Sequence, residues 1–320
     1  MNFHTCRIAV MDLGSQTFRI AGAEVTHSEA KVLFSLRENV RMGASLMQTG
    51  KFSEEAMRRG ISALKYFMTV VAEYEIGSFM AIGTAAFRKA SNATTFLAMA
   101  KDIGIPIEII SSEQEASLAV KGAYLTLEHD ISPWIMVDCG GGSTEIELCF
   151  RNKIQAGISL DLGAVSLTDA CLRSGRDLRL AASKKIQQGI SDLKETLSVA
   201  KAIVATGGTA TTIASVALGL SQYDPSKVRG FEISFDELET LYEKISALDI
   251  KSRKKLKGLE AERADIFPAG IAILLELIRY LGLSKLIISD GGILLGLLTA
   301  FMEKECNFYV ESSSARGLYL

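Results

Sequence analysis

Short apolar runs alternate with longer stretches of helical periodicity along this chain, a pattern typical of α/β proteins. Two of the runs, Ile8–Met11 and Trp134–Val137, lead directly into glycine-bearing loops, and each loop is followed by residues able to start a second strand. Both regions therefore predict a strand–turn–strand hairpin. P-loops and dinucleotide fingerprints need a helix after their glycines, so the pattern favours hairpin loops whose backbone N–H groups form a nest for an anion.

Further elements follow each predicted hairpin. In the first half we expect a third strand over Ala30–Arg41, a helix over Ser53–Tyr74 with Ser53 as its N-cap, a strand over 79–84, a helix over Asn92–Ile103, a strand over 107–110 and a helix from Ser112. In the second half we expect a connector after the hairpin, then helix 186–199, strand 201–205, a helix through Ala217, helix 264–280, strand 285–288 and helix 293–305.

The repeated order of elements predicts an approximate internal duplication with a boundary at Asp130–Pro133. We therefore expect an N-terminal domain over residues 1–130 and a C-terminal domain over 131–320. For the C-terminal helix, residues 296–320, two placements are open: within the second domain, or packed against the first.

Composition narrows the function classes. The 320 residues are 48% hydrophobic and carry a formal net charge of −2, so no global basic field recruits duplex nucleic acid. Five cysteines, an odd number without CxxC spacing, predict reduced thiols and a cytoplasmic protein. The longest apolar stretch, Ala269–Ser289, is interrupted by Glu276, Arg279 and Lys285, which predicts a buried helix and strand and no membrane partner.

The glycine loops are the first candidate site. Asp12 and Asp138 occupy equivalent places at the two predicted strand ends, where a carboxylate can hold a hydrated divalent cation while neighbouring N–H groups bind phosphate oxygens. Gly207-Gly208-Thr209 and Asp290-Gly291-Gly292 also follow predicted strands. The alternative is that the Asp-Gly pairs simply make turns.

Glu115 and Glu145 are the candidate acid–base pair, because hydrolysis of a phosphoanhydride needs an aligned and partly deprotonated water. The alternative for Glu115, like Glu113, is favourable interaction with a helix dipole. Arg88 and Arg263 are candidate phosphate clamps, or ordinary surface residues. The basic run over residues 251–257 is either a solvated face or a track for a long polyanion.

Taken together, these residues resemble the exopolyphosphatase and guanosine pentaphosphate phosphohydrolase family. The resemblance rests on seven segments in the right order: Met11–Arg19, Gly83–Ala90, Glu113–Ala116, Val137–Glu145, Ser159–Val165, Ala205–Thr211 and Arg263–Gly270. It implies two ribonuclease-H-like domains of the actin, Hsp70 and sugar-kinase superfamily with an interdomain active-site cleft. It also implies Mg²⁺-dependent release of terminal phosphate from polyphosphate or guanosine pentaphosphate, a place in the stringent response, and a possible homodimer.

The resemblance also implies roles for individual residues. Glu115 matches the family's catalytic base, and Glu145 matches its second catalytic carboxylate. Asp138 and Glu145 together match the metal site. The expected phosphate-binding residues are Asp12, Gly14, Ser15, Arg88, Gly140, Gly141, Gly142, Ser143, Gly207, Gly208, Thr209 and Arg263.

Three positions depart from the family pattern: Gln16, Ser112 and the pair Leu294-Leu295, where an Arg-Glu pair is usual. Two alternatives to the hydrolase remain open. One is a kinase of the same superfamily, and the other is a sensor that binds polyphosphate or an alarmone without turnover.

Overall fold

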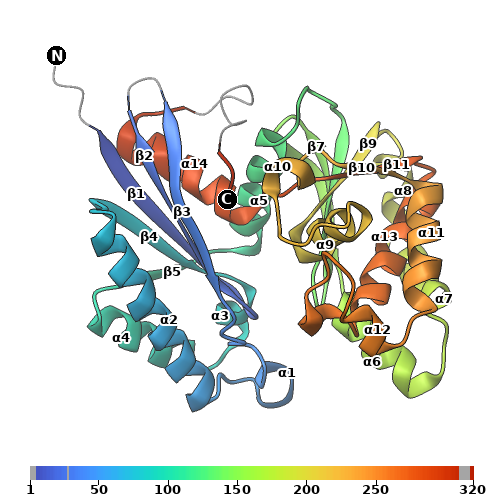
Figure 1. The fold of residues 1–320 in the computed structure, drawn as a ribbon, viewed down its shortest axis with the longest axis horizontal. Helices are drawn as coiled ribbons and strands as arrows, with labels where there is room; N and C mark the ends of the chain where they lie inside the picture. The colour runs from blue at the N-terminus through green and yellow to red at the C-terminus, as the bar shows by residue number, and fades with distance from the viewer. Residues whose placement is uncertain (1–4, 27–28, 310–317) are drawn as a thin grey trace. The chain divides into compact units, whose positions relative to one another are not determined.

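The structure is a computed structural model in which residues 5–26, 29–309 and 318–320 are described. The chain divides into two compact units (Figure 1). Unit 1 comprises Met1–Gly122 and Ile293–Leu320, and unit 2 comprises Ala123–Gly292. The division therefore lies within helix α5 (Ser112–Leu125) and directly before helix α14 (Ile293–Cys306).

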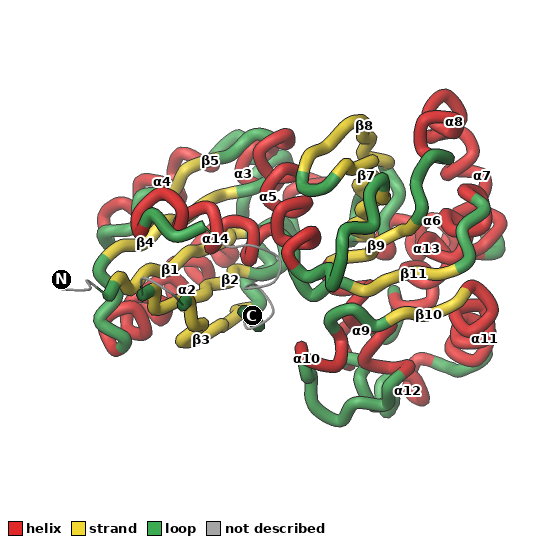
Figure 2. Tube along the Cα trace, turned by 90° about the horizontal axis from the view of Figure 1, so that it is seen from above, coloured by secondary structure: helices red, strands yellow, loops and turns green. Residues whose placement is uncertain are grey.

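Unit 1 is built on a five-stranded sheet with the order β3-β2-β1-β4-β5 (Figure 2). Strands β1, β2 and β3 are antiparallel, whereas β4 and β5 run parallel to β1. The elements are β1 (Cys6–Leu13), β2 (Phe18–Val25), β3 (Ala30–Glu38), α1 (Leu46–Thr49), α2 (Glu54–Glu73), β4 (Ser78–Gly83), α3 (Ala85–Lys89), α4 (Ala93–Asp102), β5 (Ile107–Ile109), most of α5, and α14.

The core of unit 1 joins one face of this sheet to α2 and α4. Helix α2 begins where expected, because the Ser53 hydroxyl accepts a hydrogen bond from the Ala56 N–H at 3.2 Å. Its buried stripe, which includes Leu64 and Phe67, packs with Met11 and Phe96 in one cluster. The packing places the carboxyl ends of the parallel strands β1, β4 and β5 at one edge of the sheet.

Helix α14 packs on β1 and β2 in unit 1. Gly296 permits close approach to α5, because a Cβ at this position would collide with the Leu118 carbonyl oxygen. Residues 310–317, which belong to the expected helix 296–320, lie outside the described residues.

Cys306 at the end of α14 is joined to Cys6 of β1 by a disulfide bond. The prediction of reduced thiols throughout was wrong for this pair, because two cysteines 300 residues apart in the chain meet only in the folded unit. Cys139, Cys149 and Cys171 are free and buried. Among the described residues, no helix combines the length and apolar character needed to cross a membrane.

Unit 2 is built on a six-stranded sheet with the order β10-β11-β9-β6-β7-β8. Its elements are β6 (Trp134–Cys139), β7 (Thr144–Phe150), β8 (Lys153–Leu160), α6 (Ala164–Ser174), α7 (Leu178–Ile190), η1 (Ser191–Leu193), α8 (Lys194–Leu197), β9 (Ala202–Thr206), α9 (Gly207–Ala217), α10 (Pro225–Val228), β10 (Glu232–Ser234), α11 (Phe235–Ser246), α12 (Ile250–Arg253), η2 (Ala261–Arg263), α13 (Phe267–Leu281) and β11 (Lys285–Ile288).

The path β8-β7-β6-β9-β11 repeats the order and directions of β3-β2-β1-β4-β5 in unit 1. This repetition confirms the predicted duplication at the level of topology. Strand β8 lies where we expected only a connector.

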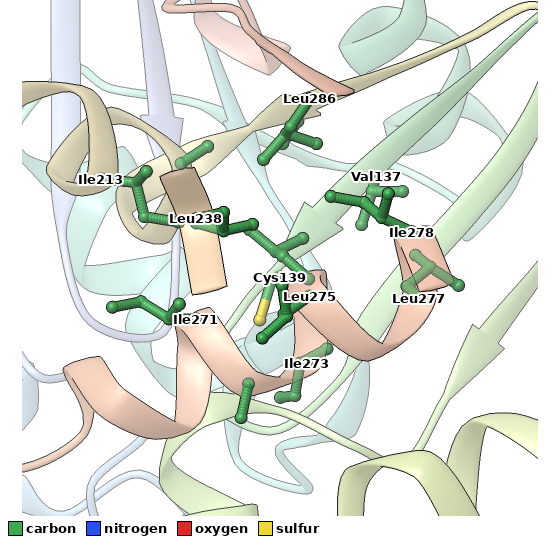
Figure 3. Close-up of a cluster of buried hydrophobic side chains, with 14 of the residues drawn as sticks. Val137, Cys139, Ile213, Leu238, Ile271, Ile273, Leu275, Leu277, Ile278 and Leu286 are labelled. Atoms are coloured by element: carbon green, nitrogen blue, oxygen red, sulfur yellow. The ribbon is translucent and has the colours of Figure 1, made fainter. Parts of the chain in front are cut away.

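Helix α13 forms the centre of the unit 2 core. Its residues Ile271 to Ile278 are almost completely buried and pack with Val137 and Cys139 of β6 and with Ile213 and Leu238 of α9 and α11 (Figure 3). A helix buried on nearly every side is hydrophobic all round, as Ala269–Ile278 is except for Glu276. The core therefore holds α9 firmly against the end of β6.

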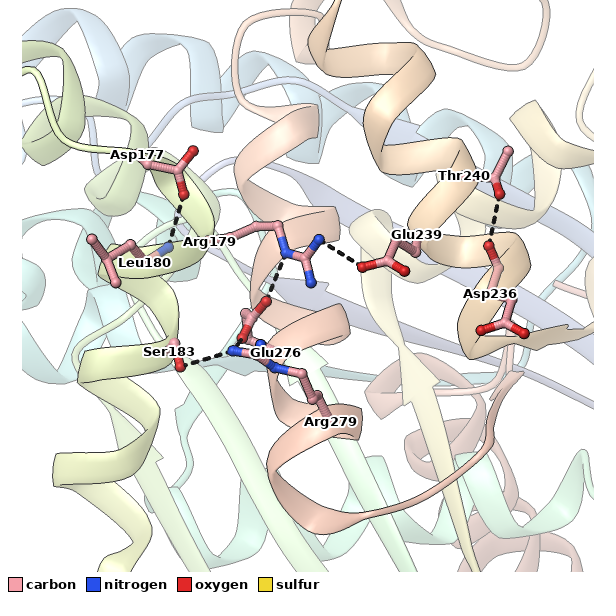
Figure 4. Close-up of polar contacts among 9 residues, drawn as sticks. All are labelled: Asp177, Arg179, Leu180, Ser183, Asp236, Glu239, Thr240, Glu276 and Arg279. Atoms are coloured by element: carbon pink, nitrogen blue, oxygen red, sulfur yellow. Dashed lines mark hydrogen bonds and ion pairs between the residues drawn. The ribbon is translucent and has the colours of Figure 1, made fainter.

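Glu276 is the charged exception within α13, and it is fully paired. Its carboxylate accepts hydrogen bonds from Arg179 of α7, at 2.7 Å, and from Arg279 (Figure 4). Arg179 also donates to Glu239 of α11 at 2.7 Å. Pairing both oxygens offsets the cost of burying the carboxylate, and the network joins α7, α11 and α13.

Candidate active site

The two predicted hairpin loops are built alike. In unit 1 the Gly14 N–H donates to the Thr17 carbonyl at 3.0 Å, and in unit 2 the Gly140 N–H donates to the Ser143 carbonyl at 3.0 Å. Both predicted strand–turn–strand hairpins are thus confirmed. Each loop follows a strand whose parallel neighbours end at the same edge of the sheet, the usual ligand-binding edge of open α/β sheets.

The unit 2 loop leaves backbone donors unused. Within the described chain, the N–H groups of Gly141 and Gly142 donate no hydrogen bond, and both residues are exposed. The carbonyl groups of Gly140 and Gly141 instead accept hydrogen bonds of 2.9 Å from backbone N–H groups in the first turn of α6, which fixes the loop against this helix. Successive free N–H groups held in this way can bind phosphate oxygens. In unit 1 the Ser15 N–H is likewise without an acceptor among the described residues.

Asp138 and Glu145 stand directly opposite each other on the antiparallel strands β6 and β7. Ser159 of β8 is the next residue in this row, and its hydroxyl donates to Glu145 Oε1 at 2.9 Å. Residues paired across antiparallel strands have Cβ atoms about 5 Å apart on the same face. The strand register therefore places the two expected metal-site carboxylates side by side and orients one of them.

Helix α9 begins beside this row. Gly207 has φ +80°, and a Cβ there would collide with the Asp138 carboxylate. At Gly208 a Cβ would collide with the guanidinium group of Arg263, which Glu260 holds through a 2.9 Å hydrogen bond. The structure thus brings Arg263 and the helix N-terminus together, a combination that favours a bound anion.

Thr209 and Ser143, two expected phosphate ligands, hold the loop together in the structure. The Thr209 hydroxyl is buried and donates to the Cys139 carbonyl at 2.9 Å, so it ties α9 to β6. The Ser143 carbonyl closes the hairpin turn. Burial raises the pKa of the neighbouring Cys139 thiol to about 12, so this group stays protonated and unreactive.

In unit 1 the structure joins two residues that the sequence had placed in separate roles. Arg88 of α3 donates to Glu115 of α5 at 2.8 Å and to the Ile110 carbonyl at 2.9 Å. Both side chains are partly exposed, at 26% and 31%. The pair lies beyond the carboxyl ends of β4 and β5, at the same edge of the sheet as the Gly14 loop.

Asp12 is 2% exposed and is bound by Arg19, whose Nε donates to Asp12 Oδ2 at 3.0 Å. The two residues are partners in the β1–β2 register. Arg19 belongs to a motif that we took from the sequence, but we predicted no role for it. The sequence could have predicted this ion pair, because a hairpin closed between Leu13 and Phe18 necessarily pairs residue 12 with residue 19.

Glu147 is a second carboxylate on the face of β7 that carries Glu145. It lies over Gly157 of β8, where a Cβ would collide with the carboxylate unless the Glu147 side chain moved. Burial, followed by the negative charge of Glu145, raises the pKa of Glu147 to about 7.

In the last glycine loop, Asp290-Gly291-Gly292, the aspartate forms an ion pair with Arg229. Asp290 is bound by Arg229 through hydrogen bonds of 2.6 and 3.0 Å, and this ion pair is buried. Leu294 and Leu295, which follow the loop, are 6% and 0% exposed in α14. They contribute to packing at positions where the resembled family usually has a charged pair.

The donor set beside α9 suits a hard cation. Asp138 and Glu145 supply two carboxylates with free backbone N–H groups nearby, and Mg²⁺ is usually held by one or two carboxylates with water and substrate phosphate completing its shell. No group of three or more His, Cys, Asp or Glu side chains suited to a metal occurs among the described residues. The two carboxylates of Asp138 and Glu145 fit a hydrated Mg²⁺, which is usually held by one or two carboxylates.

Comparisons with known proteins identify the family of this chain. Residues 22–305 match the model of the Ppx/GppA phosphatase family. The chain is 28% identical over 310 residues to "Exopolyphosphatase 2" of Mycobacterium tuberculosis, covering 91% of this chain and 97% of that protein. It is 26% identical over 299 residues to a guanosine-5'-triphosphate,3'-diphosphate pyrophosphatase of Aliivibrio fischeri, covering 92% of this chain and 59% of that protein.

Among solved structures, the Aquifex aeolicus PPX-GPPA enzyme superposes with a TM-score of 0.78 at 28% identity, over 92% of this chain and 99% of that chain. The fold is accordingly the actin-like two-domain fold. This chain belongs to the Ppx/GppA phosphatase family.

Proposed function

We propose that this protein is a Mg²⁺-dependent phosphoanhydride hydrolase that releases terminal phosphate from inorganic polyphosphate, guanosine pentaphosphate or both. The observation that carries the proposal is the row formed by Asp138, Glu145 and Ser159 beside the N-terminus of α9. It combines paired carboxylates, backbone anion donors and an arginine, which are the parts that phosphoryl transfer to water needs. The names of the relatives support the two substrates.

Each part has an assigned task in this proposal. The N–H groups of Gly141 and Gly142, the first turn of α9 and Arg263 bind phosphate oxygens and hold the terminal phosphoryl group. Asp138 and Glu145 would hold the Mg²⁺, which when bound offsets the negative charge of the phosphates. Ser159 keeps the Glu145 carboxylate in one orientation through its 2.9 Å hydrogen bond.

Glu115 is the proposed general base that accepts a proton from the attacking water. Arg88 holds the Glu115 carboxylate in place through Nη1, and its other guanidinium nitrogens can bind a phosphate oxygen. Asp12 orients Arg19 in the unit 1 loop. We also propose a homodimer, as the resemblance implies, and a cytoplasmic protein, a prediction from the cysteines that now rests on the three free thiols alone.

The test measures phosphate release with Mg²⁺ from medium-chain polyphosphate and from guanosine pentaphosphate. Glu115→Ala and Glu145→Ala should each lower turnover at least ~100-fold with substrate binding largely retained, as expected for loss of a general base or of a site carboxylate. Glu113→Ala is the matched control, because Glu113 lies in the same first turn of α5 and is exposed.

Two results would overturn the proposal. Binding of either substrate without phosphate release above the Glu115→Ala background would identify a sensor. Loss of phosphate from ATP only when a second, phosphate-accepting substrate is present would identify a kinase.

A further inference from the structure

A cluster of five exposed lysines in unit 2 takes no part in the site described above. Lys244 lies on α11, Lys251 on α12, and Lys254, Lys255 and Lys257 in the turn that follows α12. Within the described chain none of the five forms an ion pair. The net charge of the protein is −2, so this cluster is a local concentration of positive charge on a nearly neutral molecule.

Arg253 lies within the same basic run but has a different task. Its guanidinium group donates to the carbonyl groups of Ile245, Ser246 and Ala264 at 2.9, 3.4 and 3.4 Å. Arg253 therefore fixes the turn at the end of α11. Of the charges in the run over residues 251–257, those of the lysines remain available to a ligand.

Two of the five lysines line one cavity. A cavity of about 270 Å³ lies at the end of α9, and Lys244 and Lys257 line it from opposite elements together with Val216, Leu241 and Leu256. The cavity is thus lined by the end of α9, by α11 and by the turn that follows α12. Lys244 and Lys257 therefore lie beside the same cavity.

The chain connects this cluster to the phosphate loop along α9. Gly258 lies against the Ser215 carbonyl near the end of the helix, where a Cβ would collide, and Arg263 lies over Gly208 at its start. Seven residues of helix separate these points, which is about 10 Å at 1.5 Å per residue. The segment between the lysines and Arg263 also contains Glu260, which is paired with Arg263, and the exposed Glu262. The positive charge of this segment is therefore concentrated at its lysine end.

We propose that this lysine cluster binds the distal phosphates of a long inorganic polyphosphate chain whose terminal phosphate is held at Gly207 and Gly208. The inference rests on the function proposed above. Polyphosphate carries a negative charge on each repeating unit, so several lysines with flexible stems can contact it without a shaped pocket. Tripolyphosphate and guanosine pentaphosphate have too few linked phosphates for the same chain to engage both places.

The test replaces Lys251, Lys254, Lys255 and Lys257 with glutamine and measures KM and kcat for long-chain polyphosphate and for tripolyphosphate. We expect KM for the long chain to rise about tenfold, which corresponds to about 1.4 kcal/mol, with kcat and both constants for tripolyphosphate unchanged. Added salt should raise the KM of the wild type for the long chain more than that of the variant. Lys153, Lys184, Lys185 and Lys201, all exposed in unit 2, are replaced together as the control for net charge.

An unchanged KM for long-chain polyphosphate, or an equal rise in the control variant, would overturn the proposal. A direct binding measurement with long-chain polyphosphate separates it from the proposed function. If the wild type binds the chain more tightly than the lysine variant but releases no phosphate, the hydrolase proposal fails and the binding surface stands.

Discussion

Arg88 Nη1 donates a hydrogen bond of 2.8 Å to the Glu115 carboxylate, which joins the proposed phosphate clamp of unit 1 to the proposed general base. We expect Arg88→Ala to lower kcat at least ~10-fold, because the carboxylate loses its orienting partner, and Glu115→Gln at least ~100-fold. The double variant should have a kcat no lower than that of Glu115→Gln alone, because both substitutions disable the same Arg88–Glu115 pair.

The measurement is steady-state phosphate release by the two single variants and the double variant. Arg59→Ala is the control, because Arg59 forms a comparable 2.8 Å pair with Glu55 on α2 and has no proposed role in the reaction. Effects that multiply in the double variant would show that Arg88 and Glu115 act independently.

The hydrogen bond from Ser159 to Glu145 gives a second prediction. A hydrogen bond to a charged group contributes about 1.5–3 kcal/mol, so Ser159→Ala should lower kcat by roughly 10-fold to 100-fold with little change in KM. Ser159→Thr keeps the hydroxyl and should retain most of the activity. Ser174→Ala, at an exposed serine of α6, is the control, and wild-type kcat in Ser159→Ala would contradict the positioning role.

Glu147 should make stability fall as pH rises. Its pKa is about 7 in the folded protein against an ordinary value of 4.5. The folded state therefore holds the proton more tightly, and this contribution is complete below about pH 4.5 and lost as pH rises through 7. The loss amounts to at most about 3 to 4 kcal/mol, because each pKa unit of difference between 4.5 and 7 corresponds to about 1.4 kcal/mol.

Urea unfolding without divalent cations, from pH 4 to pH 8, measures this effect. Glu147→Gln should be as stable as the wild type near pH 4 and more stable at pH 8, because glutamine stays uncharged. Glu108→Gln, at an exposed position of β5, is the control and should follow the wild type throughout. Stability curves of the wild type and Glu147→Gln that stay parallel over this range would show that burial does not shift the pKa as described.

The disulfide between Cys6 and Cys306 predicts a thiol count. Denatured without reductant, the protein should show the three thiols of Cys139, Cys149 and Cys171, and with reductant all five. Cys6→Ser should lower the free energy of unfolding by about 2–5 kcal/mol, the usual cost of losing a native disulfide. Cys171→Ser leaves the bridge intact and is the control. Five thiols before reduction would contradict the bridge.

Local patterns predicted much of the fold. The α2 helix carried an N-cap serine, acidic residues in its first turn and a regular apolar stripe, so every local signal agreed. Strand β8 was missed although Ile154, Ala156, Ile158 and Leu160 alternate with polar residues or glycine. Its short, half-exposed pattern has no continuous apolar run, and only pairing with β7 shows that it belongs to the sheet.

By itself, the sequence determined the two hairpin loops, their duplication and the family. Glycine spacing and strand periodicity involve only residues that are close together in the chain, so they can be read directly from the sequence. Tertiary structure alone decided which side chains meet. The partnerships of Arg88 with Glu115, Ser159 with Glu145, and Cys6 with Cys306 join separate elements, and their formation depends on strand register and helix packing. No local pattern records those relations, since they arise only when distant apolar faces are buried together.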